Sequence, residues 1–315
     1  MVSSDVQLNS IEEALRTKYW HWSLYESVPG CQSLRSFLIS ALPHIAPSSW
    51  TERWDFGGVY INGLRQPLET TLTYPCKIEY YEPKFAIAEA AHIFPSFESH
   101  YIIYQDEAVA VVYKPPGLSS MPAKEQHHFS LKASVEKELG TTIHMPSRLD
   151  VSAQGLVIVS TSIKTHAKLQ QAFENRCVKK LYLCASHARP NWQEHRVTSP
   201  ISRDPLHPVL RSTSHAQGQS AETIFTALDA KDPAYSVFAA QPITGRTHQI
   251  RVHAASLGLP LLGDRFYCGA PAEHLHLVSY ALSLQHPIND APISFELPER
   301  LLPSWVPSDL PKLSP

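Results

Sequence analysis

The chain has 315 residues, of which 43% are hydrophobic, so it can form one large domain or two ordinary domains around a sizeable core. Its 27 Lys and Arg residues face 29 Asp and Glu residues, which excludes the overall basic character of a general nucleic-acid binder, and any basic surface must be local. No leader-like segment and no apolar run of roughly 18 residues is present, so we expect a cytoplasmic protein without membrane contact.

Residues 1–30, which include the aromatic stretch KYWHWSLYE, predict an irregular N-terminal extension that packs on another part of the protein. A small module follows over residues 31–92. The apolar spacing of LRSFLISALP and the stretch from Pro47 to Ser49 predict two helices, and Asn62-Gly63 predicts a turn between strands.

The stretch GGVYINGLRQP resembles the G-x-V-x-V-N-G turn of S4 domains, which implies an S4-like α/β module. Ordinary S4 domains present a basic helix pair to structured RNA, whereas the second predicted helix here offers only Arg53. An RNA-binding role and a plain packing role for this module therefore both stay open.

A second domain is expected over residues 93–306, followed by a C-terminal tail over residues 307–315. Its predicted strands lie in YIIYQDEAVAVVYKPPGL, in the β-branched run GLVIVST, and in VKKLYLCA, ETIFTAL and AYSVFAAQ, the last two as a hairpin. One helix should lie between Gly245 and Gly258. Another should follow Ser162 as N-cap, with its buried side formed by Ile163, Leu169, Ala172 and Phe173. This order predicts a mixed α+β fold.

Positive charge gathers between Met145 and Lys180, where two acidic residues face six basic ones. A solvated helix face would explain the charge as well as a binding surface would. Within this region Arg148 and Asp150 directly precede a buried strand, and both groups are costly to desolvate without a partner or a function. The basic residues are Arg148, Lys164, Lys168, Arg176, Lys179 and Lys180.

Two longer stretches together resemble the RluA-type pseudouridine synthases. SRLDVSAQG is similar to the family motif H-R-L-D-x-x-T-S-G, and GRTHQIRVHAASLGLPLLGD contains G-R-T-H-Q-I-R-V-H and G-x-P-L-L-G-D intact. VVYKPPGL, VKKLYLC and LHLVSYALSLQHP resemble further family segments, so the resemblance covers about residues 102–298. It implies a mixed, mainly antiparallel sheet with flanking helices and a central cleft.

The resemblance implies an isomerase that converts specific uridines of rRNA or tRNA to pseudouridine as a monomer, with structured RNA as its partner. Asp150 matches the catalytic aspartate, Tyr182 the aromatic residue at the target base, and Arg251 the basic partner of the aspartate. Arg148 matches the arginine that fills the space left by the flipped base. Further RNA contacts are expected from Lys179, Lys180, Arg246 and His248.

The required chemistry agrees with these roles, because the bond from N1 to C1′ must break and C5 must take its place. A carboxylate can act there as a nucleophile or as a base, and Arg251 would keep it ionised. Tyr182 offers the uracil a flat surface and a hydroxyl. A stacked uridine must first flip out at a cost of a few kcal/mol, part of which an inserted Arg148 could offset.

Neither a cofactor nor a metal is expected. The five cysteines show no metal-type spacing, and no glycine-rich nucleotide loop is present. His248 and His253 stand roughly 140° apart on a helix and so cannot chelate as the histidines of H-E-x-x-H do. The start of this helix, Thr244–Thr247, could hold an RNA phosphate or form a plain cap.

The first motif departs from the family at Ser147, Ala153 and Gln154, where His, Thr and Ser are usual. These changes favour an alternative, an RNA-binding protein that keeps the fold without turnover, whereas the retained Asp150, Tyr182 and Arg251 oppose it. A hydrolase that uses Asp150 would need a second acid or base, and the sequence offers none.

Overall fold

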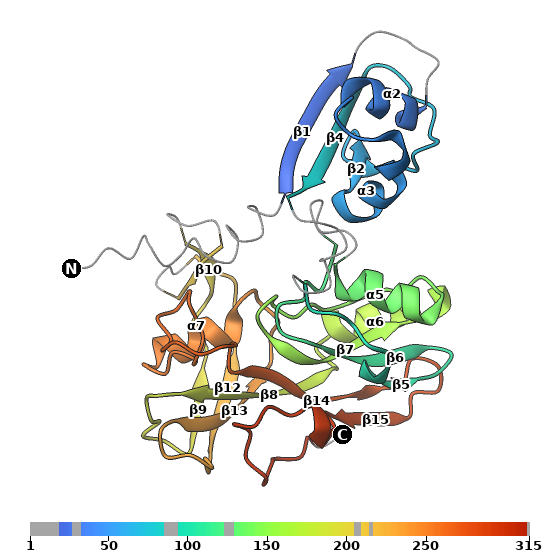
Figure 1. The fold of residues 1–315 in the computed structure, drawn as a ribbon. Helices are drawn as coiled ribbons and strands as arrows, with labels where there is room; N and C mark the ends of the chain where they lie inside the picture. The colour runs from blue at the N-terminus through green and yellow to red at the C-terminus, as the bar shows by residue number, and fades with distance from the viewer. Residues whose placement is uncertain are drawn as a thin grey trace, which may run out of the picture. The chain divides into compact units, whose positions relative to one another are not determined.

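The computed structural model describes residues 19–26, 33–84, 94–122, 129–204, 209–213 and 217–313. The chain forms two compact units, one from Met1–Ser96 with Met121–Ser134 and the other from Phe97–Ser120 with Val135–Pro315. Figure 1 shows the elements of each unit in chain order. No helix in the described part of the chain is long and apolar enough to cross a membrane.

The first unit contains an antiparallel sheet of order β1-β4-β2-β3 with two helices on its buried face. The predicted helices are confirmed, and so is the turn at Asn62-Gly63, where both residues have positive φ as a two-residue hairpin requires. The elements are β1 (Tyr19–Glu26), α2 (Leu34–Ala41), α3 (Trp50–Gly57), β2 (Val59–Ile61), β3 (Leu64–Arg65) and β4 (Cys76–Pro83).

The prediction that residues 1–30 are irregular is wrong for Tyr19–Glu26, which form β1 and pair with the whole of β4. Aromatic side chains favour strands, and alternation along β1 places Trp22 against the core of the unit while His21 stays exposed. The expected packing on another part of the protein is confirmed for this strand. Residues 1–18 lie outside the described part.

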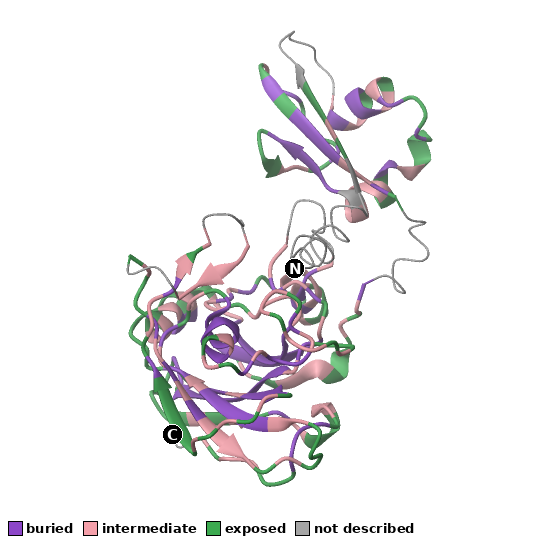
Figure 2. Cartoon of the chain, turned by 90° about the vertical axis from the view of Figure 1, so that its left-hand side faces the viewer, coloured by how far each residue is buried: buried purple, intermediate pink, exposed green. Residues whose placement is uncertain are grey.

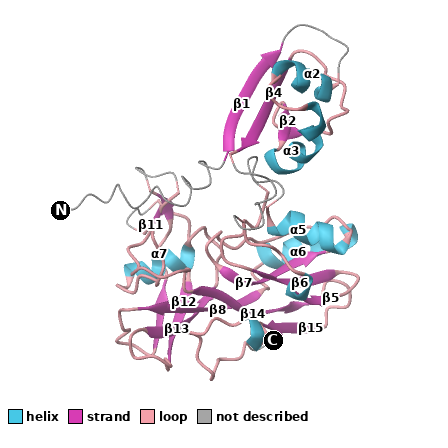
Figure 3. Ribbon diagram, viewed as in Figure 1, coloured by secondary structure: helices cyan, strands magenta, loops and turns pink. Residues whose placement is uncertain are grey.

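The second unit is built on a nine-stranded sheet of order β5-β6-β7-β14-β8-β13-β12-β9, with β15 beside β14. Its described strand pairs are antiparallel except β7 with β14, which run parallel, and Figure 3 shows the helices beside this sheet. The strands are β5 (Ile102–Gln105), β6 (Val109–Lys114), β7 (Gln154–Ser160), β8 (Lys179–Ser186), β9 (Glu194–Val197), β12 (Thr223–Leu228), β13 (Ser236–Pro242), β14 (Leu277–Gln285) and β15 (Pro292–Glu296).

Three longer helices, a small hairpin and three short 3-10 helices (Pro47–Ser49, Ser99–Tyr101 and Glu299–Leu301) are the other described elements. The longer helices are α5 (Leu131–Leu139), α6 (Ile163–Glu174) and α7 (Gln249–Ser256), and the hairpin consists of β10 (Ser202–Arg203) with β11 (Arg211–Ser212). Helix α6 packs on β7, and α7 packs on β12 and β13. The central strands are largely buried, as Figure 2 shows, and every residue of β7 is buried as predicted.

The predicted buried side of α6 is correct for Leu169 and wrong for Ile163, which is 83% exposed. Ile163 is the first residue of the helix and lies outside its packing contact with the sheet. Thr165 is buried instead. Its hydroxyl can be buried because it donates to the Ala108 carbonyl at 3.1 Å and lies 2.7 Å from Ser160 Oγ.

Gly155 allows the close approach of β7 to β14. Its φ is +115°, and a Cβ atom there would lie 2.3 Å from the Ser279 carbonyl oxygen. We predict that Gly155→Ala lowers the free energy of unfolding by more than about 3 kcal/mol, because backbone strain and overlap add.

Gly140→Ala is the matched control, since Gly140 also has positive φ, +62°, but a Cβ atom added to it would have no neighbour within 4 Å. This variant should lose only about 1–2 kcal/mol. Urea denaturation followed by circular dichroism measures both, and equal losses would contradict the role of the β7–β14 contact.

Candidate active site

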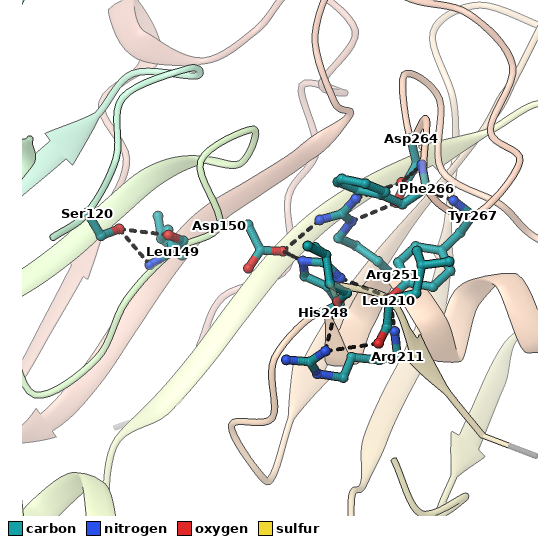
Figure 4. A network of polar contacts seen from close by, with 11 residues as sticks. Ser120, Leu149, Asp150, Leu210, Arg211, His248, Arg251, Asp264, Phe266 and Tyr267 are labelled. Atoms are coloured by element: carbon teal, nitrogen blue, oxygen red, sulfur yellow. Dashed lines mark hydrogen bonds and ion pairs between the residues drawn. The ribbon is translucent and has the colours of Figure 1, made fainter. Parts of the chain in front are cut away.

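Asp150 lies in the loop that leads into β7, and about a quarter of its side chain is exposed. Its Oδ2 accepts a hydrogen bond of 3.0 Å from Arg251 Nη1 on α7, and His248 Nε2 lies 3.9 Å away. Figure 4 shows the carboxylate facing these two side chains. The structure therefore brings the aspartate together with two residues that lie about a hundred positions further along the chain.

Arg251 is buried and held by a second carboxylate. Its Nε and Nη2 donate to the two oxygens of Asp264, each at 2.7 Å, and that carboxylate is fully buried. The backbone N–H groups of Phe266 and Tyr267 also donate to Asp264 Oδ1, and both rings lie 5.3 Å from the guanidinium carbon. Such bidentate pairing fixes the plane of the guanidinium and aims Nη1 at Asp150.

The Asp150 carboxyl is ionised at neutral pH. Loss of water contact alone would raise its pKa, but the charge and hydrogen bond of Arg251, together with His248 and Lys114, outweigh this effect and hold the pKa below its usual value. A carboxylate that stays charged while partly withdrawn from water is suited to act as a nucleophile or as a base.

His248 is neutral and has a fixed orientation. Burial lowers the pKa of its imidazole to about 4, and its backbone adopts the left-handed conformation, with φ +56°, just before α7. Its Nδ1 lies 2.9 Å from the Tyr267 hydroxyl, which already accepts the Arg211 backbone N–H at 3.0 Å. We infer that Tyr267 donates to Nδ1, so that the imidazole proton sits on Nε2 and faces Asp150.

Lys114, at the end of β6, is fully buried beneath the same loop. Its ammonium donates to the carbonyls of Pro115, Leu118 and Val151 at 2.7–3.0 Å. Burial lowers its pKa to about 7, and the Asp150 charge opposes the shift. Sequence reasoning assigned no role to Lys114 or to Asp264, although both stand in the quoted motifs.

Tyr182 comes from β8, where it pairs with Ser279 of β14 and Ala240 of β13. Its ring packs on the cluster that includes Ala153 and Phe225. Burial, with a smaller contribution from the Asp150 charge, raises the pKa of Tyr182 to about 12, so its hydroxyl stays protonated at neutral pH. Tyr182 and Asp150 therefore lie within electrostatic reach of each other.

The two lysines expected to bind RNA lie on opposite faces of β8. Strand alternation puts Lys180 on the face of Tyr182, and its Nζ lies 5.6 Å from the centre of the Phe173 ring. Lys179 points to the other face, where it lines a pocket with residues of β12, β13 and the segment 311–313. Arg148 is exposed beside the Asp150 loop.

The turn before α7 satisfies its own polar groups. Gln249 Oε1 accepts the Thr244 hydroxyl at 2.6 Å and the Arg246 backbone N–H at 3.0 Å, and Arg246 Nε donates to the Ser220 carbonyl. These bonds favour a plain structural turn over a phosphate site at Thr244–Thr247. In the described part of the chain, no three or more His, Cys, Asp or Glu side chains are grouped to hold a metal.

Two of the three residues that depart from the first motif, Ala153 and Gln154, make their polar contacts away from the Asp150 carboxylate. Gln154 pairs with Val278, whose other partner is Leu183, so it faces away from Tyr182, and its Oε1 accepts the Tyr113 hydroxyl at 2.8 Å. Ala153 is buried, and its backbone N–H donates to the Asp150 carbonyl at 3.1 Å. These changes leave the contacts of the Asp150 side chain intact.

Residues 108–256 match the protein family described as RNA pseudouridylate synthase. The chain is 36% identical to the uncharacterized RNA pseudouridine synthase YjbO of Bacillus subtilis over 67% of this chain and 74% of that protein. It is 31% identical to the dual-specificity RNA pseudouridine synthase RluA of Salmonella typhimurium over 62% and 92%. The structure of human RNA pseudouridylate synthase domain containing 1 shares the fold, with TM-score 0.55, 22% identity and coverage of 67% and 89%.

We predict that Asp264→Asn lowers the free energy of unfolding by about 3–5 kcal/mol, because it leaves the buried Arg251 without its full counter-charge. Asp290→Asn is the control. Asp290 forms an exposed pair with Lys168 at 2.9 Å, and Asn tolerates its positive φ. Loss of that pair should cost less than about 1 kcal/mol. Urea denaturation compares the two variants, and an Asp264→Asn protein as stable as the control would refute the prediction.

Proposed function

Because the chain belongs to the RluA-type family of RNA pseudouridine synthases and is therefore an isomerase that acts on RNA, we propose that it modifies a specific uridine in structured rRNA or tRNA with Asp150 as the catalytic carboxylate. The observation that carries this proposal is the ionised Asp150 carboxylate, which Arg251 of α7 holds at 3.0 Å, while Tyr182 packs in one cluster with Ile250 and Ala254 of the same helix.

The reaction rearranges the uridine without a second reactant. The bond from N1 to C1′ breaks, the uracil turns, C5 bonds to C1′, C5 loses its proton and N1 gains one. Asp150 would start the sequence by attack on the sugar or by removal of a proton beside it. The partial exposure of Asp150 supports this role, because a fully buried carboxylate could not reach a flipped nucleotide.

Tyr182 and His248 would serve the base and the carboxylate. The protonated Tyr182 offers its ring to the turning uracil and its hydroxyl to a polar edge of the base. The neutral His248 faces Asp150 and adds no second positive charge that would weaken the nucleophile. Arg148 and Lys180 would contact the RNA around the flipped nucleotide, whereas Arg246 is held by the Ser220 carbonyl in a turn that favours a structural role.

The S4-like module would contribute to the stability of the protein or to the choice of RNA substrate. It would contribute less to RNA binding through positive charge. Its arginines are engaged inside the module: Arg35 with Glu69, Arg53 with Glu82, and Arg65 with the Trp54 carbonyl and ring. Phosphate binding by these side chains would require those contacts to break. We propose that the protein acts as a monomer and place its action on RNA in the cytoplasm.

We predict that Asp150→Asn keeps RNA affinity within about twofold and lowers turnover by several powers of ten, because it removes the charge with little change of shape. Filter binding gives the affinity, and tritium release from RNA labelled at uridine C5 gives the turnover. Turnover at the wild-type level in a folded Asp150→Asn variant would disprove the catalytic role of Asp150. Wild-type protein that binds cellular RNA and releases no tritium would favour the alternative of an RNA binder without catalysis.

We predict that Arg148→Ala lowers turnover at saturating RNA by about tenfold. In this variant the arginine side chain no longer fills the gap that the flipped uridine leaves in the base stack, and unstacking a base costs a few kcal/mol. Lys164→Ala is the control, because it removes the same charge from an exposed position of α6. In both variants, the slope of log RNA affinity against log salt concentration should decrease by a similar small amount. If both also lowered turnover equally, Arg148 would be an ordinary phosphate contact.

A further inference from the structure

Ser120 forms an unusual pair of hydrogen bonds with the residue before Asp150. Its Oγ donates to the Leu149 carbonyl at 2.7 Å and accepts the Leu149 backbone N–H at 3.0 Å. One hydroxyl thus satisfies both backbone groups of Leu149, and Figure 4 shows the two contacts beside Asp150. Ser120 is 4% exposed, so water has little access to these groups.

On the N-terminal side of Asp150, few other contacts in the described part of the chain fix the backbone of the loop. Leu149 and Asp150 belong to no helix or strand, and no sheet ladder fixes their backbone. On the far side of Asp150, the Val151 carbonyl accepts the Gly117 N–H at 2.8 Å and Lys114 Nζ at 3.0 Å. The segment from Lys114 to Ser120 therefore holds the residues before and after the carboxylate.

We propose that Ser120 is a positioning residue that sets the backbone of Asp150 so that its carboxylate meets Arg251. This inference rests on the proposed role of Asp150 as the reacting group. Ser120 itself does not touch the carboxylate, and it acts only through Leu149. A shift of about 1 Å in a reacting group can cost roughly a hundredfold in rate, so a small backbone error would be visible in turnover.

A displaced Asp150 would also titrate differently. The charged or titratable groups that influence it are Arg251 and His248 from the region of α7, Lys114 from β6, Tyr182 from β8 and Tyr267. Arg251 provides the largest opposition to the effect of burial. A carboxylate that moves away from Arg251 keeps the cost of burial and loses this compensation, so its pKa must rise.

The experiment measures turnover and RNA affinity of Ser120→Ala by tritium release and filter binding, with bulk cellular RNA labelled at uridine C5. We expect kcat to fall about 10- to 100-fold while affinity stays within about twofold. The ratio of kcat/KM at about pH 4.5 to that at neutral pH should also fall below the wild-type ratio. Ser120→Thr keeps the hydroxyl and should retain most of the turnover.

Ser160→Ala is the matched control, because Ser160 is also a buried serine that donates to a backbone carbonyl, at the opposite end of β7. It should lose stability and keep the wild-type pH profile. If Ser120→Ala is poorly folded, Ser120→Cys keeps the volume with a weaker hydrogen bond and should change kcat and the pH profile in the same direction.

Wild-type kcat and pH profile in Ser120→Ala would overturn the proposal, and so would equal losses in the Ala and Thr variants without a pH shift. Inactivity of Asp150→Asn beside a fully active Ser120→Ala would reject only the positioning role. Full activity of Asp150→Asn would instead reject the catalytic role on which it rests.

Discussion

The buried guanidinium of Arg251 is the group on which the rest of this site depends. Burial of a lone guanidinium would cost several kcal/mol, and the fully buried Asp264 offsets most of that cost through two hydrogen bonds of 2.7 Å. Those bonds use Nε and Nη2 and leave Nη1 for Asp150. A lysine could not replace it, because a single ammonium lacks the planar fork that serves two carboxylates in fixed directions.

One guanidinium shared between two carboxylates leaves Asp150 charged but incompletely neutralised. His248 adds no charge at neutral pH, since burial lowers the pKa of its imidazole to about 4, and the Lys114 ammonium is engaged by three backbone carbonyls. A carboxylate fully matched by cations would be a poor nucleophile, and one without a cation would take up a proton. The network keeps Asp150 between these limits.

The sequence predicted those parts of the fold that depend on local pattern. The β-branched run that forms β7 and the spacing that forms α6 and α7 are local signals, and the motif resemblance located Asp150, Tyr182 and Arg251. The strand Tyr19–Glu26 was missed because its partners in β4 lie 50 to 64 residues further along the chain. The contact of Ser120 with Leu149 was missed for a similar reason, because no periodicity joins residues 29 apart. Lys179 and Lys180 could have been separated, since strand alternation places only Lys180 on the side of Tyr182.

The same geometry explains how the first motif can vary without loss of its central residue. The contacts that hold the Asp150 loop use the backbone atoms of Leu149, Val151 and Ala153, so they do not depend on the side chains at those positions. Gln154 faces the other side of the sheet, where its carbonyl oxygen accepts the Tyr113 hydroxyl. Gly155 has no such freedom, because its Cβ would overlap the Ser279 backbone. Thr and Ser can therefore give way to Ala153 and Gln154 while Asp150 keeps its contact with Arg251, whereas Gly155 must stay a glycine.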